Sequence, residues 1–122
     1  MRINKKGTNI SFTPAIEEYL EKRIASLEKL IDVNEPTLQI DVELGQTTKH
    51  HQSGDIFRAE ISVHIGGQSF RAVSERSDLF SAIDNVKDEI MRELRSYKGK
   101  KLSLVKKGGQ KLKAMIRNFY GK

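Results

Sequence analysis

The chain has no cysteine, no tryptophan, no long apolar run and no acidic residue near its C-terminal end. Without cysteine, disulfides, thiolate catalysis and zinc or iron–sulfur sites with cysteine ligands are excluded. No stretch reaches the roughly 18 consecutive apolar residues that a membrane-spanning helix needs. The start of the chain is not followed by the apolar region of a signal peptide. We therefore expect a soluble cytoplasmic protein without a membrane partner.

The missing acids divide the charge of the chain into two parts. Glu93 is the last acidic residue, and the segment from Lys98 to Lys122, here called the acid-free segment, holds nine Lys/Arg. The first 97 residues hold 13 Lys/Arg against 16 Asp/Glu, so they are slightly acidic. A basic surplus at one end favours a polyanionic partner, most often nucleic acid, because counterions released from phosphates drive such binding. A merely solubilising segment is the weaker interpretation, because apolar residues such as Ile116 and Phe119 are interleaved.

The length of 122 residues fits one domain with a short appendage. We predict a domain over residues 1–101 and a basic tail over 102–122, with a short helix at 110–120. Period-two alternation of apolar and polar residues predicts strands with one wet face, and apolar residues at helical spacing predict helices. The predicted strands are 2–6, 38–44, 57–65 and 68–74; one helix starts at Pro14 and ends near 32–34, and another lies between Ser77 and Gly99.

Residues with special backbone preferences mark the ends of these elements. Thr13 before Pro14 is a helix start, with a capping hydroxyl followed by proline at the first helical position. Ser77 is predicted to cap the second helix, with Asp78 in its first turn, and Gly99 to stop it. Gly66-Gly67 is a two-residue hairpin signal, and the polar stretch 46–54 reads as a loop.

The predicted order is β-α-β-β-β-α. A strand–helix–strand unit makes its two strands parallel, and the later strands are antiparallel neighbours, so a four-stranded mixed sheet results. The clear strands have one apolar face, and each helix has one apolar stripe. Both helices should therefore pack on the same face of the sheet. The fold class is an α/β (α+β) two-layer sandwich.

Nothing in the chain predicts catalysis. His50 and His51 lie in the polar loop and His64 on the wet face of a strand, where solvated histidines are more common than metal ligands. No glycine-rich phosphate loop, nucleophile elbow or metal-binding helix motif occurs. We predict no enzyme activity, no metal and no cofactor. A small enzyme that uses His50 or His51 is the alternative.

The basic residues carry more information than the histidines. Arg92 and Arg95 are three apart on the second predicted helix and share a face that Lys98 continues. Lys22 and Lys29 lie on one side of the first. Because both helices cover one sheet face, these residues could form an outward basic strip, and ordinary surface charge is the alternative. Lys87 and Arg23 would lie beside the strip and Arg76 at its edge; the tail would add Lys106, Lys107, Lys111, Lys113 and Arg117.

The segment Asp78-Leu79-Phe80-Ser81-Ala82-Ile83-Asp84 follows a strand that leaves the Gly-Gly hairpin. In this context it resembles a motif of the ribosome hibernation promoting factor family. That family includes the ribosome-associated inhibitor A and the sigma-54 modulation-type proteins. Ile3, Gly7, Thr13 and Leu27-Glu28-Lys29 also look like the family's opening. The resemblance covers about the first 101 residues and is to the short form of the family.

The resemblance implies a translation inhibitor that binds the small ribosomal subunit in the channel between head and body, over the mRNA and tRNA sites. Basic residues of both helices would face ribosomal RNA, with ribosomal proteins as neighbours. No small-molecule substrate is implied, and we expect a monomer off the ribosome. The implied RNA-binding residues are Lys22, Arg23, Lys29, Arg76, Arg92, Arg95, Lys98, Lys100 and Lys101.

Two features depart from the family's pattern. Members commonly have lysine after the aspartate that corresponds to Asp88, but this chain has Glu89, which removes one expected contact. The tail beyond Leu102 is also unlike the acidic or short tails of short members.

A general structured-RNA-binding module remains the alternative function. Within the motif, Phe80 is expected to pack at the helix–sheet boundary, with base stacking as the alternative.

Overall fold

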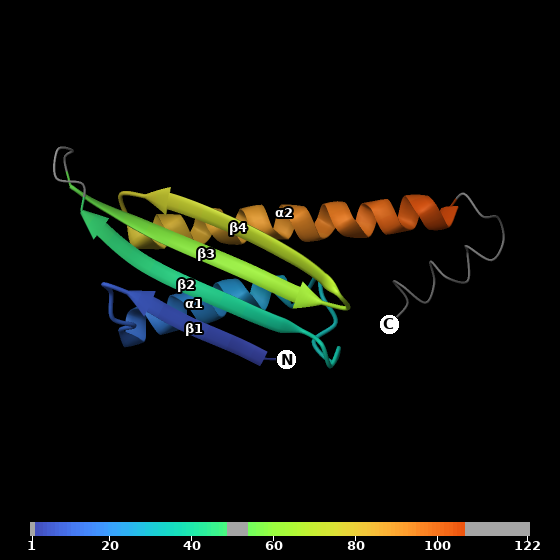
Figure 1. The fold of residues 1–122 in the computed structure, drawn as a ribbon, viewed down its shortest axis with the longest axis horizontal. Helices are drawn as coiled ribbons and strands as arrows, with labels where there is room; N and C mark the ends of the chain where they lie inside the picture. Colours follow the sequence, from blue (N-terminus) through green and yellow to red (C-terminus); the bar gives the residue numbers. More distant parts are fainter. Residues whose placement is uncertain (1, 49–53, 107–122) are drawn as a thin grey trace. The chain divides into compact units, whose positions relative to one another are not determined.

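The computed structural model describes residues 2–48 and 54–106, with side chains over 2–47 and 54–97. The chain forms two compact units, Met1–Met91 and Arg92–Lys122. The elements follow the predicted order β-α-β-β-β-α (Figure 1). They are β1 (Arg2–Thr8), α1 (Pro14–Leu27), β2 (Gln39–Thr48), β3 (Asp55–Ile65), β4 (Gln68–Arg76) and α2 (Leu79–Lys106).

The four strands form one mixed sheet in the order β1-β2-β3-β4. β1 and β2 are parallel, as the strand–helix–strand unit predicts, and the other neighbours are antiparallel. The register aligns Val42, Ile61 and Ala72 across β2, β3 and β4, so these side chains point to one face of the sheet. All three are buried, which identifies this face as the core side.

The two helices supply the other layer of the core. α1 and the first part of α2 lie on the same face of the sheet (Figure 1), which confirms the predicted two-layer sandwich. Each helix buries one stripe at helical spacing, as an amphipathic helix must when only one side meets the sheet. The buried residues are Ile16, Leu20, Ile24 and Leu27 in α1, and Leu79, Ala82, Ile83, Val86 and Ile90 in α2.

Two predicted local signals are confirmed by the backbone. The Thr13 hydroxyl accepts a hydrogen bond from the Ile16 amide at 3.2 Å, and Pro14 opens α1. Gly66 and Gly67 have φ values of 54° and 79°, in the left-handed region that favours glycine. They join β3 to β4 as a tight hairpin.

The strands β2 and β3 are longer than predicted. The expected loop at 46–54 is partly wrong, because β2 continues to Thr48 and β3 begins at Asp55, with Gln46 paired to Phe57. The ladder continues there because backbone pairing does not require apolar side chains, and threonine suits a strand. The loop that contains His50 and His51 lies outside the described residues.

The helix ends also differ from the prediction. α1 ends at Leu27, not near 32–34, because local turns follow, in which the Asp32 carboxylate accepts from the Asn34 amide at 3.0 Å. Asp78, not Ser77, caps α2, since its carboxylate accepts from the Ser81 amide at 2.9 Å. Gly99 does not stop α2, which runs to Lys106; one glycine costs a helix only about 1 kcal/mol.

Candidate nucleic-acid interface

The basic residues predicted for the first helix lie in two different settings. Of the Lys22 side chain, 68% is exposed, and its ion pair with Glu18 is long, at 3.8 Å. Such exposed pairs contribute little, so Lys22 can exchange Glu18 for a phosphate at small cost. Lys29 is exposed but lies beyond the end of α1, so the two lysines do not belong to one helix face.

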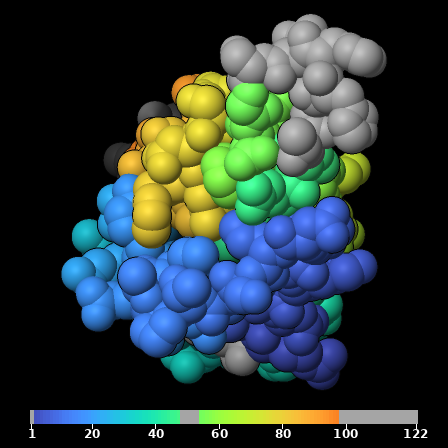
Figure 2. All heavy atoms as spheres, turned by 90° about the vertical axis from the view of Figure 1, so that its left-hand side faces the viewer, coloured from blue at the N-terminus to red at the C-terminus, as the bar shows by residue number. Residues whose placement is uncertain are grey.

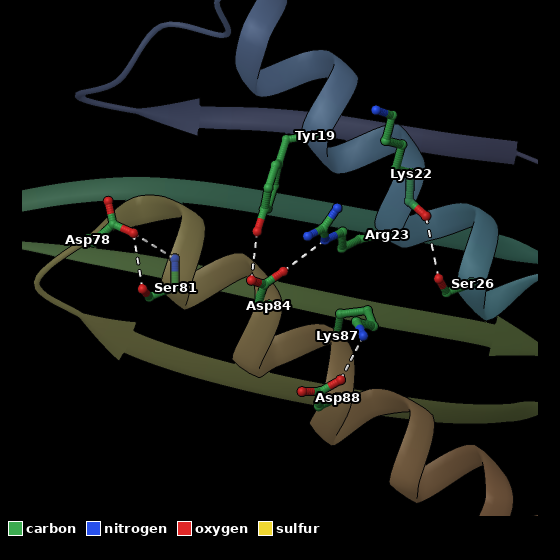
Figure 3. Close-up of polar contacts among 9 residues, drawn as sticks. All are labelled: Tyr19, Lys22, Arg23, Ser26, Asp78, Ser81, Asp84, Lys87 and Asp88. Carbon is green, nitrogen blue, oxygen red and sulfur yellow. Dashed lines mark hydrogen bonds and ion pairs between the residues drawn. The ribbon is translucent and has the colours of Figure 1, made fainter.

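Arg23 is held in a network that joins α1 to α2 (Figure 3). Its Nε donates to Asp84 Oδ1 at 2.8 Å, and only 28% of its side chain is exposed. The Tyr19 hydroxyl donates to the other carboxylate oxygen of Asp84 at 2.6 Å. The guanidinium carbon of Arg23 lies 3.7 Å from the centre of the Tyr19 ring, in a cation–π contact. The three side chains therefore form a closed set of contacts.

The ionisation of these groups reflects their pairing. Partial burial opposes ionisation of Asp84, but hydrogen bonds from Tyr19 and Arg23 outweigh it and hold the pKa of Asp84 below its ordinary value. The hydrogen bond from the Tyr19 hydroxyl to Asp84 raises the pKa of Tyr19. The hydrogen bond from the Arg23 guanidinium to Asp84 raises the pKa of Arg23. At neutral pH, Asp84 is thus a carboxylate, Arg23 a cation and Tyr19 a neutral phenol.

Phe80 lies beside this network and not in the core. The prediction that it packs at the helix–sheet boundary is wrong, because 36% of the residue is exposed. Its ring meets the Tyr19 ring edge-on, with centroids 4.7 Å apart and planes at 73°. Being next to Leu79, it is rotated about 100° from the buried stripe of α2, toward α1. Figure 2 shows the surface of α1, in blue, directly beside the β4–α2 junction, in yellow.

Arg76 and Lys87 are the other predicted site residues of the first unit. Arg76 is exposed at the end of β4, and its guanidinium donates to the Glu75 carbonyl at 2.7 Å. Lys87 is less accessible, with 21% of its side chain exposed, and it pairs with Asp88 at 2.7 Å (Figure 3). Arg76 is therefore better placed than Lys87 to meet a polyanion.

The second unit holds the remaining predicted residues. Arg92 and Arg95 are exposed, three residues apart on α2, as predicted. Four further lysines belong to α2 by backbone, and the tail residues, with the proposed helix at 110–120, lie outside the described residues. The α2 lysines are Lys98, Lys100, Lys101 and Lys106, and the tail residues are Lys107, Lys111, Lys113 and Arg117.

Tyr19 and Asp84 were not predicted as site residues. Two signals in the sequence point to them in retrospect. Tyr19 and Arg23 are four apart on α1, so they share a face, and Asp84 closes the motif that begins at Asp78. The contact itself joins residues 61 and 65 positions apart, which no local pattern reveals.

The face of the sheet opposite the helices is also polar, but its charges are largely paired with each other. Glu60 accepts from Arg71 at 2.6 Å and from Arg58 at 2.8 Å. His64 contacts Asp41 at 3.2 Å and the Ser69 hydroxyl at 2.9 Å, consistent with a satisfied surface histidine. This surface is here called the open face, and its Arg58, Arg71 and His64 each have a carboxylate neighbour.

The described residues contain neither a cluster of metal-ligand side chains nor a helix suited to cross a membrane. Among residues 2–48 and 54–106, no three histidine or carboxylate side chains gather closely enough to hold a metal ion. Within the same ranges, no helix is both long and apolar enough to cross a membrane.

Comparisons with known proteins agree with the resemblance seen in the motif. A ribosome hibernation promotion factor from Picosynechococcus sp. (strain ATCC 27264 / PCC 7002 / PR-6) is 31% identical over 100 residues, which are 82% of this chain and 50% of that protein. The Escherichia coli (strain K12) ribosome hibernation promoting factor is 28% identical over 101 residues, 82% of this chain and 96% of that protein. The chain thus spans half of the first relative and nearly all of the second.

Solved structures share the fold. The N-terminal domain of Thermus thermophilus Protein Y superposes with a TM-score of 0.65 at 33% identity, covering 80% of this chain and 99% of that domain. A ribosomal subunit interface protein from Coxiella burnetii superposes with a TM-score of 0.64 at 20% identity, which supports the fold alone. The family model described as sigma 54 modulation protein / S30EA ribosomal protein matches residues 3–102. Fold, motif and this match over most of the chain together show that the protein belongs to the sigma 54 modulation protein / S30EA ribosomal protein family.

Proposed function

We propose that this protein is a non-enzymatic ribosome-binding factor that inhibits translation and keeps idle ribosomes inactive. The observation that carries the proposal is the family match over residues 3–102, whose relatives are named ribosome hibernation factors. The exposed cations of the described residues support it, because ribosomal RNA is the main polyanion of the ribosome. We further propose that the protein is cytoplasmic and is a monomer before it binds.

The proposed site is the mRNA and tRNA channel of the small subunit, between head and body. Folded RNA exposes mostly phosphates, sugars and shape, so we expect phosphate contacts by lysine and arginine and little reading of base edges. In the first unit, Lys22, Lys29 and Arg76 are the exposed candidates. In the second unit, Arg92 and Arg95 are exposed on α2, and the acid-free segment adds affinity.

The test is binding to purified small subunits at several salt concentrations. The Arg92→Gln/Arg95→Gln variant should bind more weakly, and the slope of log affinity against log salt should fall by about 1.4 to 1.8 if both residues touch phosphate. The matched control is Arg2→Gln/Lys6→Gln, because both residues are exposed on β1 and the charge change is the same. Its slope should stay close to that of the parent protein.

Three results would decide against parts of the proposal. Failure of the parent protein to sediment with small subunits would contradict ribosome binding. Equal affinity for an unrelated RNA duplex would favour a general structured-RNA-binding module instead. Binding to the subunit without inhibition of translation in a cell-free system would leave a ribosome-binding protein that does not occupy the mRNA and tRNA sites.

A further inference from the structure

We propose that Tyr19 and Asp84 are positioning residues that aim the Arg23 guanidinium at a backbone phosphate of ribosomal RNA. The inference rests on the proposed function and goes beyond it, because the family match assigns no role to Tyr19 or Asp84. It starts from the network in Figure 3, where Arg23 contacts both the ring of Tyr19 and the carboxylate of Asp84.

The two carboxylate oxygens of Asp84 accept from different residues, and this determines which N–H groups of Arg23 remain for a phosphate. Asp84 takes only the Nε–H of Arg23 through Oδ1, whereas a common arginine–carboxylate pair uses two N–H groups and both oxygens. Its other oxygen, Oδ2, accepts from the Tyr19 hydroxyl at 2.6 Å. Tyr19 occupies Oδ2, and neither terminal amino group of Arg23 has a hydrogen bond to Asp84. These amino groups are the part of a guanidinium that fits two phosphate oxygens.

The network also fixes the plane of the guanidinium. The Tyr19 ring covers one side at 3.7 Å, and the bond from Nε to Asp84 at 2.8 Å sets the rotation within that plane. An arginine that is free to rotate would lose side-chain conformational entropy on binding a phosphate. Arg23 has already lost this entropy in the folded protein, so its binding cost is smaller. Its side chain keeps 28% exposure, so part of it stays open to solvent.

Simple electrostatics and positioning predict opposite results when Asp84 is neutralised. If Asp84 only reduces the positive charge near the RNA, Asp84→Asn should strengthen binding, because a repulsive carboxylate disappears. If Asp84 aims Arg23, the same change should weaken binding although the protein becomes more basic. Whether Asp84→Asn strengthens or weakens binding therefore distinguishes an electrostatic role of Asp84 from a positioning role.

The matched control is Asp88→Asn. Asp88 lies one helical turn after Asp84 on α2, is 61% exposed and pairs with a basic residue, Lys87, at 2.7 Å. Both variants thus remove one carboxylate and release one cation. We expect Asp88→Asn to bind small subunits as tightly as the parent or a few-fold more tightly, and Asp84→Asn to bind about three- to tenfold more weakly. The dissociation constant at fixed salt is the readout.

A second variant keeps the test decisive if Asp84→Asn unfolds. Tyr19→Phe retains the ring over Arg23 but frees Oδ2 of Asp84, which can then take a second N–H of the guanidinium. We expect about two- to fivefold weaker binding with an unchanged circular dichroism spectrum. Binding equal to that of the parent in this variant would overturn the proposal.

A double-mutant cycle tests whether Asp84 acts through Arg23. In an Arg23→Gln background, Asp84→Asn should no longer weaken binding, because no guanidinium remains to be aimed. Tighter binding by Asp84→Asn in the parent background, or weaker binding that persists without Arg23, would overturn the proposal. If the parent does not bind small subunits at all, both the proposed function and this inference fail. If the parent binds but Asp84→Asn binds more tightly, only this inference fails.

Discussion

The first unit and the acid-free segment carry their basic residues in opposite ways. In the first unit, six Lys/Arg side chains have a carboxylate as a neighbour. Among the proposed RNA-binding residues, Lys22 has Glu18, Arg23 has Asp84 and Lys87 has Asp88. The segment from Lys98 onward has nine Lys/Arg and no acid at all. Paired cations are held in place but contribute little net field, whereas a segment with only basic charges has a net positive field that attracts phosphates over distance. We infer that the first unit supplies orientation and the segment supplies affinity.

The largest expected effect follows from removing the tail. Ending the chain after Lys101 leaves three of the nine basic residues of the acid-free segment and removes six. If all six touch phosphate, the magnitude of the salt slope should fall by about four to five, at 0.7–0.9 per contact. Affinity should fall with it at low salt, while the preference for small subunits over an RNA duplex should remain.

The control for this truncation is a full-length chain in which the same six residues are replaced by glutamine. Equal slopes for the truncated and the glutamine variants would show that charge alone matters. An unchanged slope and affinity after truncation would mean that the tail is a solvated extension, and the comparison between the two regions would then be wrong.

The next effect concerns the exposed arginines of α2. Replacing Arg92 and Arg95 together by glutamate reverses charge without touching the buried residues of the helix. We expect about 10- to 100-fold weaker association with ribosomes, since two attractions become repulsions. Co-sedimentation in a sucrose gradient measures it, with circular dichroism as the check on folding. Unchanged co-sedimentation of a folded variant would remove these arginines from the mechanism.

The fold was predictable because its elements are periodic. Ile40, Val42 and Leu44 alternate with polar residues and are buried, and Leu20, Ile24 and Leu27 repeat at helical spacing and are buried too. Element ends were less predictable, since they depend on single backbone hydrogen bonds such as those that cap a helix or continue a ladder. The turn that follows α1 and the extension of β2 to Thr48 are examples.

The candidate site was only partly predictable. Exposure of Lys22 follows from its place on the polar side of a helix, but the partner of Arg23 does not, because Asp84 lies 61 residues away in the sequence. The prediction that Phe80 packs at the helix–sheet boundary was wrong for a related reason. Its contact is with Tyr19 on the other helix, and a single-helix pattern shows only which residues face the sheet.

A smaller effect is expected for Phe80→Ala. Because the ring is 36% exposed, the change should cost about 1–2 kcal/mol of unfolding free energy, most of it from the lost edge contact with Tyr19. Ile83→Ala, at a fully buried position of the same helix, should cost about 2–5 kcal/mol. Urea unfolding compares the two. Equal losses would mean that Phe80 acts as a core residue, and a stable Phe80→Ala variant with weak ribosome binding would make Phe80 a base-stacking residue.

The smallest effect belongs to the open face, which serves as the contrast to the helical layer. Hydrogen bonds from Arg71 and Arg58 outweigh partial burial and hold the pKa of Glu60 below its ordinary value of 4.5. A carboxyl with a lowered folded pKa stabilises the protein above its unfolded pKa, and this stability is lost as the pH falls through the folded value. Glu60→Gln should therefore reduce stability by about 1 kcal/mol at pH 7, and the difference from the parent should shrink below pH 4.5.

Thermal unfolding at a series of pH values measures this difference. The control is Glu75→Gln, which changes the same charge at an exposed position of the neighbouring strand β4. A Glu60→Gln difference that is the same at pH 3 and pH 7 would point to packing instead of charge. Association with ribosomes at neutral pH should not change, because none of the proposed RNA-binding residues is among the partners of Glu60, which are Arg58 and Arg71. Weaker association of Glu60→Gln would place the open face against the ribosome and would remove the contrast between the two faces.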